Sequence, residues 1–200
     1  VMVNGVKEDA DELVLAIGHS ARDTFENLFG SGFLLEQKEF AAGVRIEHLQ
    51  SKISKAQYGA GYSALPAADY KLVSRAGERA AFTFCMCPGG EVIPSASEEG
   101  GVVTNGMSNF ARDKRNANSA LVVQVRKEDF GSEHPLAGVE WQRRIERAAY
   151  SAAGGNMKAP VQLVGDFLAN KESYYFGEVK PTYSVGTAFV PMRAILPPVI

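Results

Sequence analysis

The chain has 200 residues, of which 46% are hydrophobic and 22% are charged, and this composition is typical of a globular protein. Its 21 basic and 23 acidic residues give a formal net charge of -2, so no overall field attracts nucleic acid or an anionic surface. We expect no nucleic-acid partner, and no membrane partner either, because charges and prolines interrupt each apolar stretch before the ~18 residues of a spanning helix.

The N-terminus and the cysteine content predict a reducing, cytoplasmic location. Residues 1–5 lack the basic and apolar regions of a secretory signal. Cys85 and Cys87 are separated by one residue, which is too little for an ordinary disulfide, so we expect two free thiols. The apolar end, residues 185–200, is typical either of a piece cut from a longer polypeptide or of a C-terminal strand within a core.

The first predicted elements form a strand, a turn and a helix. Residues 11–18 are typical of a short buried strand, and a turn at 19–21 leads into an amphipathic helix over 22–29. Alternating apolar positions predict another strand over 40–47, and a second helix is expected over 48–58.

The middle of the chain is rich in loops. Residues 68–75 and 80–86 resemble the two strands of a hairpin. A short strand over 91–94 is followed, after a turn at 98–101, by an extended stretch over 102–107.

The last predicted elements are a strand and the longest helix. The polar residues 116–119 lead into an apolar strand over 120–125. Residues 138–152 form an amphipathic helix that places Trp141 on its apolar face. No repeat of fixed period occurs, which excludes solenoids and coiled coils. We therefore predict an α+β fold in which this helix packs on a mixed or antiparallel sheet.

The glycine patterns argue against independent nucleotide binding. Neither Gly-x-Gly-x-x-Gly nor a P-loop sequence occurs. Gly18 lies at the end of the first predicted strand. A glycine there either allows a cofactor to approach the backbone or only turns the chain.

The stretch 85–90 is the most distinctive motif. Two cysteines on alternating residues would share one face of a strand, before a turn rich in backbone N–H groups. Three functions suit this stretch: a redox thiol, a metal ligand, or a loop that holds a flavin ring. The alternative is that both cysteines are buried and inert, because no basic residue next to them lowers the pKa of either thiol. A metal would need His19, His48 or His134, which show none of the zinc-finger spacings.

Two polar clusters, residues 104–108 and 112–119, either bind a ligand or satisfy the backbone of turns. Arg45, on the strand that also carries Glu47, is either half of a surface ion pair or a substrate clamp.

Five stretches together resemble the bacterial family of uncharacterised FAD-dependent dehydrogenases, also described as NAD(FAD)-utilising dehydrogenases. They are residues 14–25, 43–48, 82–92, 98–108 and 159–167. They follow in order over nearly the whole chain, and Cys-Met-Cys-Pro-Gly-Gly at 85–90 is specific. Full-length members carry an N-terminal dinucleotide fingerprint and a C-terminal FAD-closing segment, which this chain lacks. The resemblance therefore implies an internal fragment.

The resemblance also implies two domains. Residues 1–37 would be a returning strand and helix of the FAD-binding domain, and residues 38–200 the inserted domain that covers the flavin and shapes the substrate pocket. We therefore expect residues 11–32 not to share the core of residues 68–125. The FAD-binding remainder, a small-molecule substrate and, through a bare apolar face, a second copy of the chain are the expected partners.

The resemblance assigns candidate site residues, with FAD bound by the full-length parent but not by this fragment, and NAD(P)H as one option for the reductant. The cofactor-binding candidates are Gly18, His19, Ser20, Cys85, Cys87, Pro88, Gly89, Gly90, Thr104, Asn105 and Met107. The substrate-binding candidates are Arg45, Arg112 and Asn118, and no metal site is expected.

These candidates are expected to converge on one concave face, with the N–H groups of Gly89 and Gly90 pointing outward. The function that follows is part of an FAD-dependent oxidoreductase. A noncatalytic interaction module, and a thiol or metal protein built on Cys85 and Cys87, are the alternatives.

Overall fold

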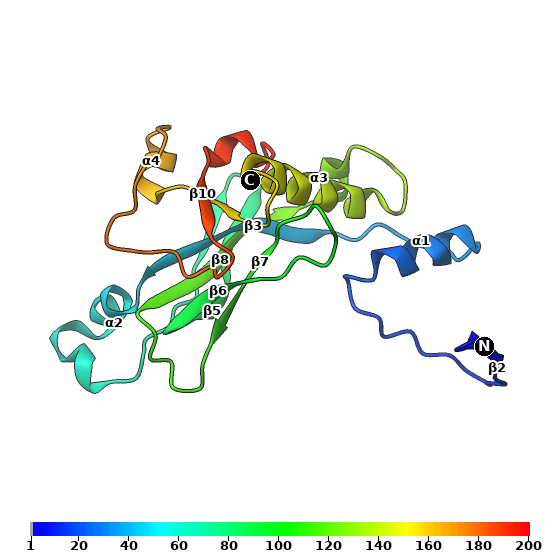
Figure 1. The fold of residues 1–200 in the computed structure, drawn as a ribbon, viewed down its shortest axis with the longest axis horizontal. Helices are drawn as coiled ribbons and strands as arrows, with labels where there is room; N and C mark the ends of the chain where they lie inside the picture. Colours follow the sequence, from blue (N-terminus) through cyan, green and yellow to red (C-terminus); the bar gives the residue numbers. More distant parts are fainter. Residues whose placement is uncertain (1) are drawn as a thin grey trace. The chain divides into compact units, whose positions relative to one another are not determined.

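The chain forms two units in the computed structural model, which describes residues 2–200 apart from the side chain of Ala76. The first unit is Val1–Leu35 and the second is Glu36–Ile200 (Figure 1). Helices combine with mostly antiparallel strands, which confirms the predicted α+β class. Within the described residues, none of the helices combines the length and the apolar character that a bilayer-spanning segment requires.

The first unit contains one hairpin and one helix. β1 (Met2–Val3) pairs antiparallel with β2 (Val6–Lys7) through Asn4 and Gly5, whose φ angles of 50° and 82° suit a two-residue turn of the primed type. The helix α1 (Arg22–Gly30) forms where the sequence predicts it.

In this chain, residues 11–18 do not form the predicted buried strand. This stretch pairs with no strand among the described residues, and its apolar side chains are exposed, with 63% for Leu13 and 84% for Val14. An extended segment needs a neighbouring strand to satisfy its backbone groups. The apolar side chains of this stretch therefore have no surface to pack on in the part of the chain that the structure describes.

The second unit is built on a four-stranded antiparallel sheet with the strand order β3-β8-β5-β4. These strands are β3 (Phe40–Leu49), β8 (Asn116–Val125), β5 (Arg79–Cys87) and β4 (Val73–Ala76). Arg45 on β3 and Phe84 on β5 both lie opposite Ala120 on β8, so these three side chains share one face of the sheet.

The start of the central strand differs from the expected turn. Residues 116–119 belong to β8, and Asn116, Asn118 and Ser119 are almost completely buried. Amides and hydroxyls are typical of turns, but here the Asn116 amide donates to Glu47 Oε1 and to the Lys180 carbonyl, at 3.1 and 2.8 Å. Because these polar groups have partners on neighbouring segments, the strand can carry them inside the protein.

A bulge interrupts β5 at the cysteines. Phe84 pairs with Ala120 and Cys87 pairs with Asn118, so the two residues between them face a single residue of β8. Cys85 has a φ of +47° there. As a result, Cys85 is exposed and Cys87 is buried.

A second hairpin follows this bulge. Pro88 and Gly89 turn the chain into β6 (Gly90–Pro94), which pairs antiparallel with β7 (Thr104–Ser108). The Ser108 hydroxyl donates to the Pro88 carbonyl at 2.6 Å, and the Gly89 N–H donates to Gln50 Oε1 at 2.7 Å. The turn is therefore fixed from both sides.

Two helices pack near opposite ends of β3 (Figure 1). The helix α3 (Ala137–Ala152) covers the start, where Phe40 stacks on Phe130 and meets Trp141 edge to face, with ring centroids 5.3 and 5.4 Å apart. Trp141 is buried, as the sequence predicts. The helix α2 (Gln50–Tyr58) follows directly after the other end of β3.

The remaining elements complete the second unit. β9 and β10 pair in parallel, and a second apolar cluster joins Val92, Val102 and Tyr183 to α3 through Ala149. The bounds of these elements are η1 (Gly59–Ala64), η2 (Lys127–Phe130), β9 (Ala159–Val161), α4 (Val164–Leu168), β10 (Thr187–Phe189) and η3 (Met192–Ala194).

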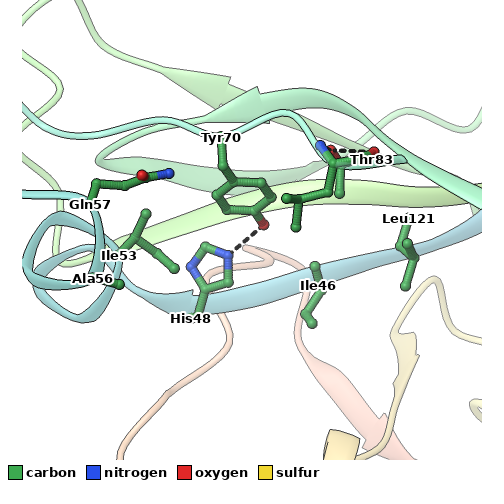
Figure 2. Close-up of a pocket in the computed structure, with 9 residues that line it drawn as sticks. Ile46, His48, Ile53, Ala56, Gln57, Tyr70, Thr83 and Leu121 are labelled. Atoms are coloured by element: carbon green, nitrogen blue, oxygen red, sulfur yellow. Dashed lines mark hydrogen bonds between the residues drawn. The ribbon is translucent and has the colours of Figure 1, made fainter. Parts of the chain in front are cut away.

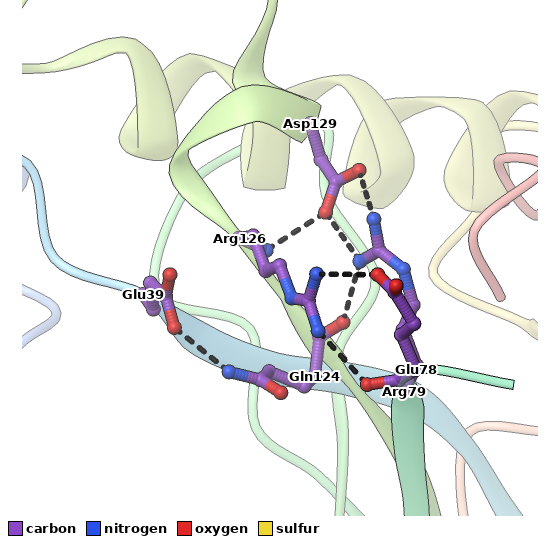
Figure 3. A network of polar contacts seen from close by, with 6 residues as sticks. All are labelled: Glu39, Glu78, Arg79, Gln124, Arg126 and Asp129. Carbon is purple, nitrogen blue, oxygen red and sulfur yellow. Dashed lines mark hydrogen bonds and ion pairs between the residues drawn. The ribbon is translucent and has the colours of Figure 1, made fainter. Parts of the chain in front are cut away.

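A network of charges joins the end of the sheet that lies away from the cysteines (Figure 3). Arg79, the first residue of β5, donates to both carboxylate oxygens of Asp129 at 2.6 and 2.8 Å. Asp129 also accepts the Arg126 N–H at 2.7 Å. The Arg79 guanidinium holds the pKa of the Asp129 carboxyl below its usual range. This bidentate pair fixes η2 against the sheet.

We predict that Gly89→Ala destabilises the protein far more than Gly131→Ala. Both glycines have positive φ, +47° and +73°, so both substitutions carry a backbone cost of about 1 kcal/mol. At Gly89 the new Cβ would also lie 1.9 Å from the Arg112 carbonyl oxygen, whereas at Gly131 it meets nothing within 4 Å. Urea unfolding should show a loss of about 3 kcal/mol for the first and about 1 kcal/mol for the second. Equal losses would contradict this packing of the turn.

Candidate functional site

The structure gathers three of the predicted site residues around the guanidinium of a fourth, Arg45. Its Nη1 donates to Asn118 Oδ1 at 2.5 Å and to the Cys85 carbonyl at 3.3 Å, and its Nη2 donates to Asn105 Oδ1 at 3.3 Å. These residues come from β3, β8, the β5 bulge and β7, which are far apart in the sequence. We refer to Arg45, Cys85, Asn105 and Asn118 as the Arg45 cluster.

The guanidinium of Arg45 is only partly used. A guanidinium has five N–H donors, and three of those of Arg45 bond to the oxygens above. The other two, one on Nε and one on Nη2, donate to no oxygen of the described residues, and the Arg45 side chain also lies close enough to the Cys87 thiol to hydrogen-bond to it. Arg45 is half-buried, so this charge is held by the fold but still reaches solvent.

Of the two alternatives for Arg45, the surface ion pair does not form in this structure. Among the described residues, no carboxylate lies within ion-pair distance of Arg45, and all three of its oxygen partners are neutral. Glu47 instead binds Thr182, whose hydroxyl donates to Glu47 Oε1 at 2.6 Å. The positive charge of Arg45 is therefore hydrogen-bonded but not neutralised.

Asn118 is the fully buried member of the cluster. It is 0% exposed, and its Nδ2 is buried with no hydrogen-bond partner in the described part of the chain. The orientation of its amide follows from Arg45, because a flipped amide would place a donor against a donor. A buried donor without an acceptor costs about 1–3 kcal/mol, so the cluster lacks an acceptor that would stabilise it.

A glycine shapes the cluster, and two exposed apolar side chains lie on the strands that contribute Cys85 and Asn105 to it. A Cβ on Gly106 would lie 2.2 Å from both Arg45 Nη1 and Asn118 Oδ1, so only glycine fits there. Phe84 and Met107 are large exposed apolar residues, at 65% and 58%. Phe84 shares the sheet face of Arg45, about 10 Å away across two strand spacings.

The glycine-rich turn after the cysteines is internal. Pro88, Gly89 and Gly90 are buried, and Gly89 donates its N–H to Gln50. The expectation that the Gly89 N–H points outward is therefore wrong, because the buried Gln50 amide takes it. Sequence reasoning missed Gln50, since a polar residue after a strand gives no sign that it will be buried.

The remaining predicted site residues lie on the β6–β7 hairpin, beside the glycine-rich turn, or in the first unit. Met107 pairs with Glu91, and Thr104 pairs with Pro94 at the far end of the β6–β7 hairpin. Arg112 has a φ of +51° and packs its carbonyl group on Gly89. Gly18, His19 and Ser20 belong to the first unit, so their approach to the other candidates stays a prediction.

The two thiols differ in their surroundings. Burial and the neighbouring Cys85 thiol raise the pKa of Cys87, and the positive charge of Arg45 only partly opposes them. The Cys87 thiol donates to the Cys85 carbonyl at 3.3 Å. Within residues 2–200, no group of three or more His, Cys, Asp or Glu side chains is arranged to hold a metal ion.

A pocket of about 390 Å³ lies on the other face of the sheet, because Ile46 and His48 alternate with Arg45 and Glu47 along β3 (Figure 2). Its walls are almost entirely apolar and come from β3, β5, β8 and α2, with Tyr70 and Leu72 closing it. His48 Nε2 and the Tyr70 hydroxyl lie 2.7 Å apart. Sequence reasoning missed Tyr70, because it lies in a stretch without a motif.

Burial shifts the pKa of both members of this pair. It lowers the pKa of His48 and raises that of Tyr70, so both side chains are neutral near pH 7. His48 Nε2 and the Tyr70 hydroxyl face each other, whereas the buried His48 Nδ1 has no hydrogen-bond partner among the described residues. Of the two sites, the Arg45 cluster therefore has the charge and the unused donors that a polar ligand requires.

We predict that Gly106→Ala displaces Arg45 from the cluster. The added methyl group would overlap both Arg45 Nη1 and Asn118 Oδ1, and the arginine is the more flexible of the two. Losing a charge-assisted hydrogen bond should lower the free energy of unfolding by about 1.5–3 kcal/mol in urea titrations. Gly177→Ala, where a Cβ meets nothing within 4 Å, is the control and should be nearly neutral. A Gly106→Ala protein as stable as the control would contradict this geometry.

Two comparisons relate this chain to known proteins. Residues 39–200 match the family described as FAD-dependent protein, C-terminal domain-like. An uncharacterised protein of Clostridium beijerinckii (strain ATCC 51743 / NCIMB 8052) is 51% identical over 201 residues, which cover 98% of this chain but 38% of the relative. The chain thus spans less than half the length of this relative. Because the family match covers most of the chain, this protein belongs to the family described as FAD-dependent protein, C-terminal domain-like.

Proposed function

We propose that this chain is part of a longer FAD-dependent oxidoreductase, in which the second unit covers the flavin and shapes the pocket for a small-molecule substrate. Membership of an FAD-dependent family supports the cofactor, and the greater length of the Clostridium relative supports a larger parent protein. The Arg45 cluster is the observation that carries the proposal for this unit.

The Arg45 cluster suits the neighbourhood of a flavin or its substrate. Among the described residues it offers a positive charge without a counter-carboxylate, two guanidinium donors that bond to no oxygen, and a buried amide donor. A bound flavin supplies the redox chemistry, while the protein orients it and sets the charge and hydrogen bonding around its ring. Arg45 would donate hydrogen bonds to oxygens of the ring or the substrate, and Phe84 and Met107 would exclude water.

The same residues do not fit the phosphate groups of FAD. The glycine-rich turn uses the Gly89 N–H internally, and no strand–glycine–helix fingerprint occurs in the sequence. The pyrophosphate would therefore bind the rest of the parent protein. This division of roles agrees with a unit that covers the flavin and does not hold FAD on its own.

The first unit would dock onto that remainder. Residues 1–38 precede the matched family region, and residues 13–17 expose a continuous apolar stretch that pairs with no described strand. We propose that this stretch joins the parallel sheet of the FAD-binding part, where strands are apolar on both faces. Gly18, His19 and Ser20 would then lie at the carboxyl end of a strand, where open sheets bind ligands.

The test uses the full-length protein that contains this chain. We predict that it purifies with flavin absorption, that the 200-residue chain is colourless, and that a suitable reductant bleaches the flavin. NADH and NADPH, tried separately, test the nicotinamide option. A colourless full-length protein that takes up no added FAD would contradict the proposal and favour an interaction module.

Val14→Asp tests the docking of the first unit. Val14 is 84% exposed in this chain, so the substitution should leave the unfolding midpoint of the 200-residue protein unchanged. In the full-length protein, a buried unpaired carboxylate should cost several kcal/mol and lower flavin occupancy. Equal effects in the two proteins would contradict the proposed strand pairing.

A further inference from the structure

We propose that the Arg45 cluster binds a carboxylate group on a flat, apolar small molecule. Two N–H donors of the guanidinium bond to no oxygen of the described residues, and they match the two oxygens of a carboxylate. This inference relies on the proposed function only for naming that molecule as the substrate. The binding itself is a property of this chain.

The partners of Arg45 orient the guanidinium for this task. Asn118 Oδ1 and the Cys85 carbonyl hold Nη1, and Asn105 Oδ1 holds one side of Nη2. All three are neutral acceptors, so they fix the plane of the guanidinium without cancelling its charge. An arginine held in this way loses little side-chain entropy when it binds a planar anion.

The surrounding groups favour one negative charge over several. In the part of the chain that the structure describes, no second cationic side chain donates to the oxygens that hold Arg45, and the amide oxygens of Asn105 and Asn118 point toward the guanidinium. A phosphate dianion requires more donors than the two that are free here. A single carboxylate would use both donors.

The sheet supplies an apolar surface beside the cluster. Ala120 lies between Arg45 and Phe84 in adjacent strands, so a small side chain separates the charge from an exposed aromatic ring. A ring attached to a carboxylate can lie over Ala120 and contact Phe84. The favoured ligand is therefore an aromatic or similarly flat carboxylate.

The experiment titrates the 200-residue protein with sodium benzoate and, separately, with benzamide, which has nearly the same shape but no charge. Calorimetry at constant ionic strength should show saturable binding of benzoate and at least tenfold weaker binding of benzamide. Absence of saturable benzoate binding, or equal binding of benzamide, would overturn the proposal. Inorganic phosphate should not displace benzoate at equal concentration, and displacement would overturn the assignment to carboxylates.

Substitutions assign the binding to this cluster. Arg45→Lys keeps the charge but removes the planar pair of donors, and it should weaken benzoate binding about tenfold or more. Arg144→Lys, on the exposed side of α3, is the matched control and should leave the affinity unchanged. If Arg45→Lys fails to fold, Asn105→Ala removes one orienting contact at an exposed position and should still weaken binding. Unchanged affinity in a folded variant of either kind would overturn the proposal.

The outcome is separable from the test of flavin binding. Benzoate binding by this chain, together with a full-length protein that binds no flavin, would leave the carboxylate site intact and remove the proposed function. A full-length protein that binds flavin, together with an Arg45 cluster that binds no benzoate, would leave the proposed function intact and remove the carboxylate site.

Discussion

The buried polar start of β8 determines how the second unit is organised. Asn116, Asn118 and Ser119 occupy the centre of a sheet, where each polar group must find a partner. Asn116 binds Glu47 and Lys180, and Asn118 binds Arg45. These bonds bring the C-terminal segment and β3 to the same part of the sheet. The Arg45 cluster is thus a consequence of how the buried Asn118 Oδ1 finds a donor, while Asn118 Nδ2 has none among the described residues.

The bulge in β5 provides the second constraint. By placing two residues opposite one, it separates the exposed Cys85 from the buried Cys87 and turns the Cys85 carbonyl toward Arg45. Gly89 and Gly106 then allow the following turn and β7 to approach closely, because neither position has room for a Cβ. The distinctive Cys-Met-Cys-Pro-Gly-Gly stretch therefore shapes the site through its backbone, while its glycine N–H groups stay inside.

The sequence predicts the periodic elements well. Alternation of apolar residues locates β3, and the amphipathic pattern of α3 places Trp141 inside. It fails at residues 11–18, because a strand depends on neighbours that this chain does not supply among its described residues. It also fails at residues 116–119, where amides typical of a turn are satisfied by segments distant in sequence.

Prediction of the site was limited in the same way. The family resemblance indicated Arg45, Asn105 and Asn118 as ligand-binding candidates, but their meeting depends on sheet register and on the hairpin that follows the bulge. Gln50 and Tyr70 were not recognisable, since their roles come from buried contacts with Gly89 and His48. Patterns that repeat along the chain are visible in a sequence, whereas single long-range contacts are not.

The central claim is that the Arg45 cluster faces the flavin and its substrate in the complete protein. A crystal structure of the full-length protein with FAD tests it most directly. The account predicts that the guanidinium of Arg45 and the side chain of Phe84 border the space in front of the isoalloxazine ring, and that residues 13–17 form a strand beside the FAD-binding sheet. A structure in which the Arg45 cluster points to solvent on the side away from the flavin would contradict it.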